Sequence, residues 1–254
     1  MKKHKICKIL LVILAIFLCV AFYELLGIRV AYKKQPEVSN TTKKETKNGS
    51  WNECSENTER AVIIEKNPEA LLQRVRLIKN AKKEIILSTF AFQSDESGKL
   101  ILGALHDAAD RGVHVRILVD GMESWIDMEG NPYFYGLSSH ENVEIKLYNK
   151  ANPLKPWEMM GRMHDKYLIA DGKRYILGGR NTYNYFLGDF PGHKNYDRDV
   201  LVVCDEPEKE NSVNQLLDYF ETIWDQEDSG YFHDNKKLAN RKSVKNAVLE
   251  LQNG

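Results

Sequence analysis

The residue types best suited to chemistry gather in one segment, residues 163–181, with the sequence MHDKYLIADGKRYILGGRN. Two β-prone runs in it flank Asp171-Gly172, a dipeptide that favours a two-residue hairpin turn of type I′. With that turn, Lys166 faces Leu177 across the hairpin, and side chains two residues apart share a strand face. One face at the open end of the hairpin then presents an imidazole, an ammonium group, a carboxamide and a residue without a side chain: His164, Lys166, Asn181 and Gly179.

This group of side chains suits the cleavage of a phosphodiester. A neutral imidazole can attack phosphorus, while the ammonium group of Lys166 and the carboxamide of Asn181 hold the non-bridging oxygens. Gly179 lets the backbone approach the phosphate because it has no side chain. The prediction depends on the register of the hairpin, since a one-residue bulge would send Asn181 to the opposite face.

The spacing of the polar and glycine residues, HxKxxxxDxxxxxxGGxN, resembles the signature of the phospholipase D superfamily. The matching positions are His164, Lys166, Asp171, Gly178, Gly179 and Asn181. The similarity extends from about residue 67 to residue 224, and GRMHDKYLIADGKRYILGGRN and NYDRDVLVV look most like bacterial cardiolipin synthases. The resemblance implies an α/β/α sandwich, in which helices flank a mixed β-sheet, and chemistry that needs no metal or other cofactor.

The resemblance also implies roles for the polar residues. His164 would be the nucleophile that forms a phosphohistidine, or the acid that protonates the leaving oxygen, and Lys166 and Asn181 would bind the phosphate. A carboxylate downstream would hold the imidazole in the right tautomer. Asp197 matches the position of that carboxylate in the resembling enzymes, and Asp199, two residues further on, is the alternative.

Four neighbouring residues complete the predicted site. We expect Gly179 and Arg180 to bind the substrate. Asp171 lies in the predicted turn, away from the face of His164, so we expect it to have a structural role together with Gly178. No metal site is predicted, because the motif has no carboxylate cluster with metal-ligand spacing.

The motif occurs once. The nearest approach to a second copy, His233-Asp-Asn-Lys236, is out of register and no Gly-Gly-x-Asn follows it. The resembling enzymes obtain a nucleophilic and an acidic histidine from two motif copies. Two interpretations therefore stay open: two chains pair as a homodimer about a two-fold axis, or the chain is the first half of a longer two-motif enzyme.

The N-terminal sequence is typical of a membrane anchor. Residues 9–23 form an uncharged apolar run that follows four lysines. A cleavable signal peptide is the alternative, but residues 20–23 lack a good small-x-small cleavage site. We predict a single-pass protein of the cell membrane and favour an extracytoplasmic catalytic domain. The predicted parts are an anchor at 1–28, a flexible tether at 29–59, a catalytic domain at 60–228 and a C-terminal tail or linker at 229–254.

Strand-like and helix-like patterns alternate from residue 60 onward. The expected strands are 61–64, 84–92, 113–119 and 142–148, and the expected helices are 68–81, 97–111 and 208–224. Helices interleaved with strands predict an α/β layered sheet. The loop at 149–163 places Trp157 and Met160 beside basic residues, so it either dips into a lipid interface or packs over the sheet.

Composition bears on the choice of function. The 36 Lys and Arg residues balance 36 Asp and Glu residues, which is a poor footprint for a non-specific binder of nucleic acid. The resemblance of the motif, the predicted anchor and the loop at 149–163 together imply a phospholipase D-type phosphodiesterase or phosphatidyltransferase that acts on membrane phospholipid. The alternatives are a single-motif endonuclease of the same superfamily and an inactive half-enzyme that serves as a binding partner. The four cysteines predict neither a disulfide framework nor a zinc cluster.

Overall fold

The computed structural model describes residues 2–33, 40, 44, 59–206, 211–233 and 235–253. The chain divides into two compact units. Unit 1 comprises Met1–Ser55 and Ala151–Gly161, and unit 2 comprises Glu56–Lys150 and Arg162–Gly254. Most of the predicted tether lies outside the described residues.

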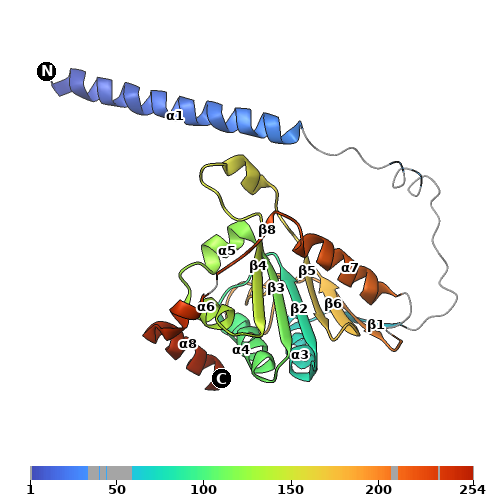
Figure 1. Ribbon diagram of the computed structural model, residues 1–254. Helices are drawn as coiled ribbons and strands as arrows, with labels where there is room; N and C mark the ends of the chain where they lie inside the picture. The colour runs from blue at the N-terminus through green and yellow to red at the C-terminus, as the bar shows by residue number, and fades with distance from the viewer. Residues whose placement is uncertain are drawn as a thin grey trace. The chain divides into compact units, whose positions relative to one another are not determined.

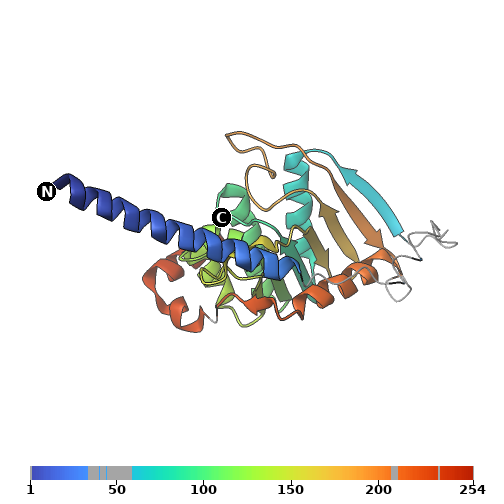
Figure 2. The same cartoon turned by 90° about the horizontal axis from the view of Figure 1, so that it is seen from above.

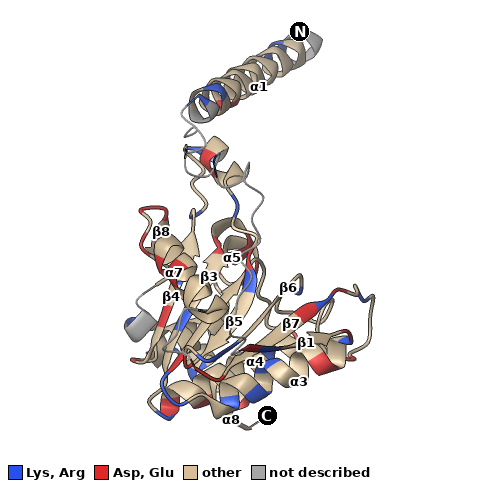
Figure 3. Cartoon of the chain, turned by 90° about the vertical axis from the view of Figure 1, so that its right-hand side faces the viewer, with Lys and Arg blue, Asp and Glu red and all other residues tan. Residues whose placement is uncertain are grey.

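Unit 1 contains a long apolar helix, α1 (Lys2–Tyr32), and a 3-10 turn, η1 (Pro156–Met160). Within α1, Lys5–Val30 is long and apolar enough to cross a membrane, by length and composition. Charged residues are few along this helix (Figure 3). It extends beyond the predicted anchor end at residue 28, because no helix-breaking residue occurs between there and Tyr32.

Unit 2 is built on one mixed sheet. Its strands are β1 (Glu59–Ile64), β2 (Glu84–Thr89), β3 (His114–Asp120), β4 (Val143–Tyr148), β5 (Lys166–Ala170), β6 (Arg174–Gly178), β7 (Asp199–Cys204) and β8 (Ser229–Tyr231). They lie in the order β1-β7-β6-β5-β2-β3-β4-β8. The neighbours β2, β3 and β4 are parallel, and the other pairs are antiparallel.

Helices cover both faces of the sheet, which confirms the predicted α/β/α sandwich (Figures 1 and 2). The helices are α3 (Asn67–Asn80), α4 (Glu96–Asp110), α5 (Gly121–Asp127), α6 (Pro132–Ser138), α7 (Ser212–Trp224) and α8 (Lys242–Asn253). Side chains of α3, α4, α6 and α8 contribute to one hydrophobic core, and α7 closes a second core on the opposite face. In β5 the side chains alternate between the two cores.

The hairpin of β5 and β6 differs from the prediction by one residue. Leu177 pairs with Tyr167 rather than with Lys166. The turn itself has positive φ at Asp171 and Gly172, as a type I′ turn requires. Lys173 is the additional residue: its carbonyl accepts a hydrogen bond from the amide of Cys204 on β7, so it adds a bulge between the turn and the ladder.

The C-terminal residues also differ from the prediction. Residues 229–253 were expected to form a tail or linker, but β8 pairs with β4, and α8 packs against α4 and α6. Val244 and Leu251 of α8 are buried in the first core. The predicted boundary at residue 228 thus lies inside unit 2, because the weak apolar stripe of α8 is stabilised by tertiary packing.

Candidate active site

The motif residues meet at one end of the sheet, where β5 begins and β6 ends. Leu168 and Ala170 of β5 enter the core beneath α3 and α4, whereas Tyr167 enters the core beneath α7. Because side chains alternate along a strand, Lys166 lies on the face of Leu168. The ammonium group is therefore directed toward the side of the sheet that α3 and α4 cover.

Lys166 is held in place but has weak counter-charge. The residue is 5% exposed, and its Nζ donates a 2.7 Å hydrogen bond to the backbone oxygen of His164. The same Nζ lies 5.2 Å from the centre of the Phe90 ring. Burial lowers the pKa of Lys166, and the negative charges of Asp165 and Asp197 oppose that shift. An incompletely compensated ammonium group at the mouth of a site favours an anionic ligand.

His164 stands at the surface of this site. The residue is exposed, and its ring packs edge-on against Phe90 with 4.6 Å between ring centres. Among the described residues, no hydrogen bond joins the imidazole to Asp197 or Asp199. The ring is thus oriented by an aromatic contact, and the support that a carboxylate would give to its tautomer stays a prediction.

The two glycines of the motif make room for two carboxylates. A side chain at Gly179 would collide with the carboxylate of Asp197, and one at Gly178 would collide with that of Asp199. Gly178 and Gly179 therefore allow the strand that carries Asp197 and Asp199 to approach β6 closely. The negative charge of Asp197 is one of the two that oppose the lowering of the Lys166 pKa by burial.

Asn181 is fixed by an extension of β2. Its Oδ1 accepts a 3.4 Å hydrogen bond from the amide of Ala91, and its side chain also hydrogen-bonds Tyr183. Burial raises the pKa of Tyr183, and the hydrogen bond from Asn181 opposes that shift. Next to it, Thr182 donates through its amide to the oxygen of Ala91. The carboxamide is thus held at the same end of the sheet as Lys166.

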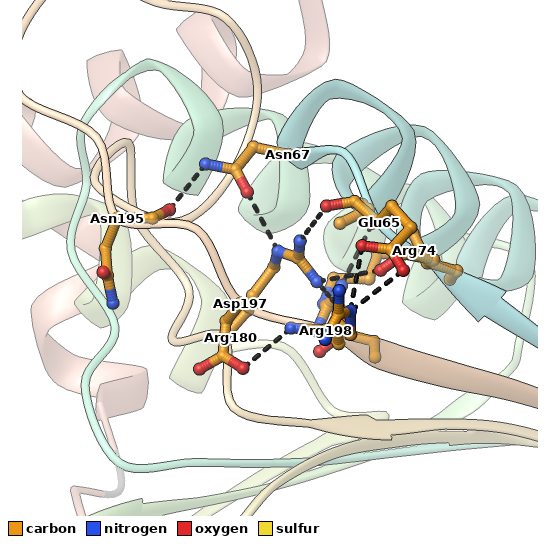
Figure 4. A network of polar contacts seen from close by, with 10 residues as sticks. Glu65, Asn67, Arg74, Arg180, Asn195, Asp197 and Arg198 are labelled. Atoms are coloured by element: carbon orange, nitrogen blue, oxygen red, sulfur yellow. Dashed lines mark hydrogen bonds and ion pairs between the residues drawn. The ribbon is translucent and has the colours of Figure 1, made fainter.

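Arg180, expected to bind substrate, is instead a buried structural residue. It is 1% exposed, and its Nε donates to Oδ1 of Asn67 at 3.0 Å. Its Nη2 donates to the oxygen of Glu65 at 2.7 Å, and its Nη1 lies 3.1 Å from Oδ2 of Asp199 (Figure 4). These contacts use the guanidinium group within the protein, so it is not available to a ligand.

Asp199 is shared by two arginines. Arg74 of α3 places its Nη1 2.8 Å from the same Oδ2 that contacts Arg180. The ion pairs are almost completely buried, and Oδ1 of Asp199 has no hydrogen-bond partner in the part of the chain that the structure describes. The engagement of Asp199 leaves Asp197 as the better placed of the two carboxylates predicted to support His164. Arg74 and Asp199 are 125 residues apart, and no local sequence signal indicated their contact.

Asp120, at the end of β3, fixes the segment that leads to His164. It is 1% exposed and accepts hydrogen bonds from the amide of Met163 at 3.1 Å and from Nε of Arg162 at 2.9 Å. Arg162 also donates to Glu123 at 2.7 Å. Sequence reasoning missed Asp120, although a carboxylate at the carboxyl end of a parallel strand is where α/β sheets place functional groups.

Asp171 lies at the turn of the hairpin, away from the motif histidine. Its carboxylate accepts hydrogen bonds from the amides of Lys82, Lys83 and Glu84, at 2.7–3.1 Å. It therefore joins the hairpin to the start of β2. Among the described residues, no group of three or more His, Cys, Asp or Glu side chains is arranged to hold a metal ion. Cys204 is buried and free, and Cys54 lies outside the described residues.

A mixed sheet between two helical layers, with the motif at one end, defines a phospholipase D-like domain. Residues 74–224 match the family described as "Cardiolipin synthase, PLD-like domain". The chain belongs to this family and thus to the phospholipase D superfamily.

Relatives and solved structures agree with this assignment. Cardiolipin synthase C of Escherichia coli K12 is 30% identical over 154 residues, which are 55% of this chain and 31% of that protein. The phosphatidylserine synthase of Haemophilus influenzae has a TM-score of 0.53 at 18% identity, over 76% of this chain and 42% of that chain. NucT of Helicobacter pylori has a TM-score of 0.51 at 17% identity, over 68% and 99%. The chain spans 38% or less of the length of the first curated relatives that it matches.

Proposed function

We propose that the chain is a phospholipase D-type phosphodiesterase or phosphatidyltransferase that acts on membrane phospholipid through a phosphohistidine on His164. The observation that carries this proposal is that an exposed histidine, His164, and the buried Lys166 lie together at one end of the sheet, with Nζ of Lys166 donating to the backbone oxygen of His164. The similarity to cardiolipin synthase C and the apolar helix α1 support phospholipid as the substrate.

In the proposed reaction, a neutral ring nitrogen of His164 attacks the phosphorus of a phospholipid. The bond from phosphorus to the headgroup oxygen breaks, and a second acidic group protonates that oxygen. Lys166 and Asn181 hold the non-bridging oxygens, and Asp197 stabilises the charged imidazole. Water or an alcohol then attacks the phosphorus of the phosphohistidine, and the second group, deprotonated in the first step, takes the proton of the attacking hydroxyl. The bond from phosphorus to the ring nitrogen breaks, which releases phosphatidic acid or a new phosphodiester and restores the imidazole.

The acidic group belongs to a second copy of the motif in this proposal. It comes either from a second chain in a homodimer or from a second motif-bearing half. The match to NucT covers 99% of that chain and 68% of this one, so a chain with one domain of this fold exists, and this supports the first arrangement. The domain is proposed to work at the cell membrane, on the extracytoplasmic side of a single-pass anchor.

The test is mass spectrometry of phosphatidylglycerol vesicles incubated with the full chain in the presence of EDTA. We expect phosphatidic acid if water is the acceptor and cardiolipin if a second phosphatidylglycerol is, and neither with His164→Asn. Lipid turnover that persists in that variant contradicts the proposal. A parallel incubation with single-stranded DNA examines the endonuclease alternative, and cleavage of DNA without lipid turnover would replace the proposed function.

A further inference from the structure

The loop of unit 1, residues 151–161, packs on the C-terminal part of α1. The indole of Trp157 meets the Tyr23 ring edge-on, with 4.9 Å between ring centres. The hydroxyl of Tyr23 donates a 3.0 Å hydrogen bond to the backbone oxygen of Leu154. Gly27 is buried, and a side chain there would collide with the indole of Trp157. The absence of a side chain at Gly27 thus leaves the space that the indole of Trp157 occupies.

This contact lies at one end of the apolar segment. The membrane-length segment of α1 ends at Val30. At a rise of 1.5 Å per residue, Gly27 lies about 5 Å and Tyr23 about 10 Å before that end along the helix axis. In a bilayer this is the boundary between hydrocarbon and headgroups, where tyrosine and tryptophan are enriched because their rings are apolar and their tips polar.

The loop also exposes apolar side chains. Leu154 is 78% exposed and Met160 is 65% exposed, although their neighbours on the loop pack on α1. When exposed apolar side chains beside a bilayer-length helix move from water into the acyl boundary, the free energy of the system falls. The basic residues Arg29, in the last turns of α1, and Lys33, directly after this helix, lie at the end of the apolar segment, where they suit phospholipid phosphates.

The loop continues directly into the strand of the motif histidine. His164 is three residues beyond Gly161, so at most about 11 Å of chain separates the loop from the imidazole. Arg162, which follows the loop, is fixed to Asp120. A restraint on the depth of the loop is therefore a restraint on the depth of His164.

We propose that residues 151–161 and the last three turns of α1 form an interfacial module that sits in the headgroup layer of a phospholipid bilayer. Because only three residues connect the module to His164, the module keeps this residue within about 11 Å of the headgroup layer. This inference rests on the proposed function for its role in catalysis, but its physical content, the depth of the loop, is independent of turnover.

The variant that tests the position of the loop is Gly27→Leu, whose new side chain fills the space that the indole of Trp157 occupies. Ala15→Leu is the matched control, because it adds the same side chain in the middle of α1, away from the loop. Each is combined with Leu154→Cys in a chain whose native cysteines are replaced, and the cysteine carries an environment-sensitive fluorophore. The full chain is placed in phosphatidylglycerol vesicles that contain lipid with a nitroxide quencher on the headgroup.

We expect the headgroup nitroxide to quench the probe strongly in the parent and in Ala15→Leu, and at least twofold less in Gly27→Leu. If Gly27→Leu does not insert into the membrane, Trp157→Ala replaces it, with Trp125→Ala, an exposed tryptophan of α5, as its control. A probe that the nitroxide does not quench in the parent overturns the inference.

Activity gives the second readout. Gly27→Leu should reduce turnover of vesicle lipid about tenfold, yet leave turnover of a monomeric short-chain phosphatidylglycerol within about twofold. An equal loss on both substrates overturns the proposed role of the module. If the parent turns over neither substrate, the proposed function fails, and the quenching measurement alone then decides the position of the loop.

Discussion

Two groups of charged residues lie on either side of the last residues of β6, and they are built in opposite ways. Around His164 and Lys166, the imidazole is exposed and the ammonium group donates to a single backbone oxygen. Around Asp199, two arginines converge on one buried carboxylate. Both groups contain a buried cation, but only the first leaves donors for a ligand.

The difference shows how the same residue types serve two purposes. A buried charge costs free energy unless it is paired and hydrogen-bonded, so the arginines of the Asp199 cluster stabilise the fold only together with their partners. Lys166 bears part of that cost without a close counter-ion. We interpret the unpaired charge of Lys166 as a feature of a binding site, in which the phosphate of the substrate supplies the missing counter-charge.

The largest effect should follow the loss of His164. His164→Asn removes the proposed nucleophile, and we expect lipid turnover to fall at least about 10⁴-fold. Because the side chain is exposed, the free energy of unfolding should change by less than about 0.5 kcal/mol. Product analysis by mass spectrometry and denaturant titration in detergent measure the two quantities. If His164→Asn instead destabilised the fold by several kcal/mol, His164 would be a structural residue like those of the Asp199 cluster, and the two groups would not differ in purpose.

The neighbouring aspartates give the sharpest comparison. Asp199→Ala leaves Arg74 and Arg180 buried without their carboxylate, and we expect unit 2 to lose about 3–5 kcal/mol of stability. Asp197→Ala removes a half-buried group and should cost less than about 0.5 kcal/mol, while turnover falls about 100-fold. Denaturation curves and turnover of both variants test this. The reverse pattern, with Asp197 stabilising the fold and Asp199 supporting turnover, would exchange the roles of the two carboxylates.

Asp120 should affect catalysis by position. Asp120→Asn weakens the contacts that hold Arg162 and the amide of Met163, and we expect kcat to fall about 10- to 100-fold because His164 is less well placed. KM should change little, since Asp120 is separated from the substrate by the segment that it holds. Steady-state kinetics on monomeric lipid separates kcat from KM. An unchanged kcat would exclude a positioning role.

Asp171 should behave as a residue of the fold. Asp171→Ala loses the acceptor for three backbone amides and places alanine at positive φ, so we expect a destabilisation of about 1–2 kcal/mol. Turnover per folded molecule should stay unchanged. Asp171→Asn, which tolerates positive φ and keeps one acceptor oxygen, should lie between. A loss of turnover without a loss of stability would make Asp171 catalytic instead.

An effect on stability of opposite sign, a gain rather than a loss, concerns Lys166. Its pKa is lowered by burial, so below that pKa its charged form costs free energy in the folded state. Lys166→Met should therefore abolish turnover and yet stabilise the fold by about 1 kcal/mol at neutral pH. The gain should shrink as the pH rises toward the ordinary pKa of lysine and the native side chain loses its proton. Denaturation curves at neutral and alkaline pH provide the check.

Much of this arrangement was predictable from local patterns. The alternation from residue 60 onward placed the main strands and helices, and Asp171-Gly172 placed the hairpin turn. The register was wrong by one residue because the carbonyl of Lys173 bonds to β7. A pattern within a hairpin contains no information on a third strand.

Arg180 shows a second limit of sequence reasoning. An arginine inside a phosphate-binding motif suggests a ligand contact, but the side chain turns into the protein toward Asn67 and Asp199. Its partners are remote in sequence, as is the contact of Arg74 with Asp199. The partners of the loop at 149–163 and of the predicted tail at 229–254 were likewise not predictable from their own residues, because these partners are set by the tertiary fold.

The pairing of β1 with β7 constrains the order in which the protein is made. Glu59 of β1 pairs with Cys204 of β7, so about 140 further residues must be synthesised after β1 before its partner strand is present. The carbonyls of Ile64 and Glu65, which receive Arg180, come directly from that strand. At about 5–20 residues per second, β1 stays unpaired on the ribosome for roughly 7–30 seconds. During this interval β1 offers unpaired backbone groups together with the apolar side chains of Val62 and Ile63, which stay exposed even in the folded chain.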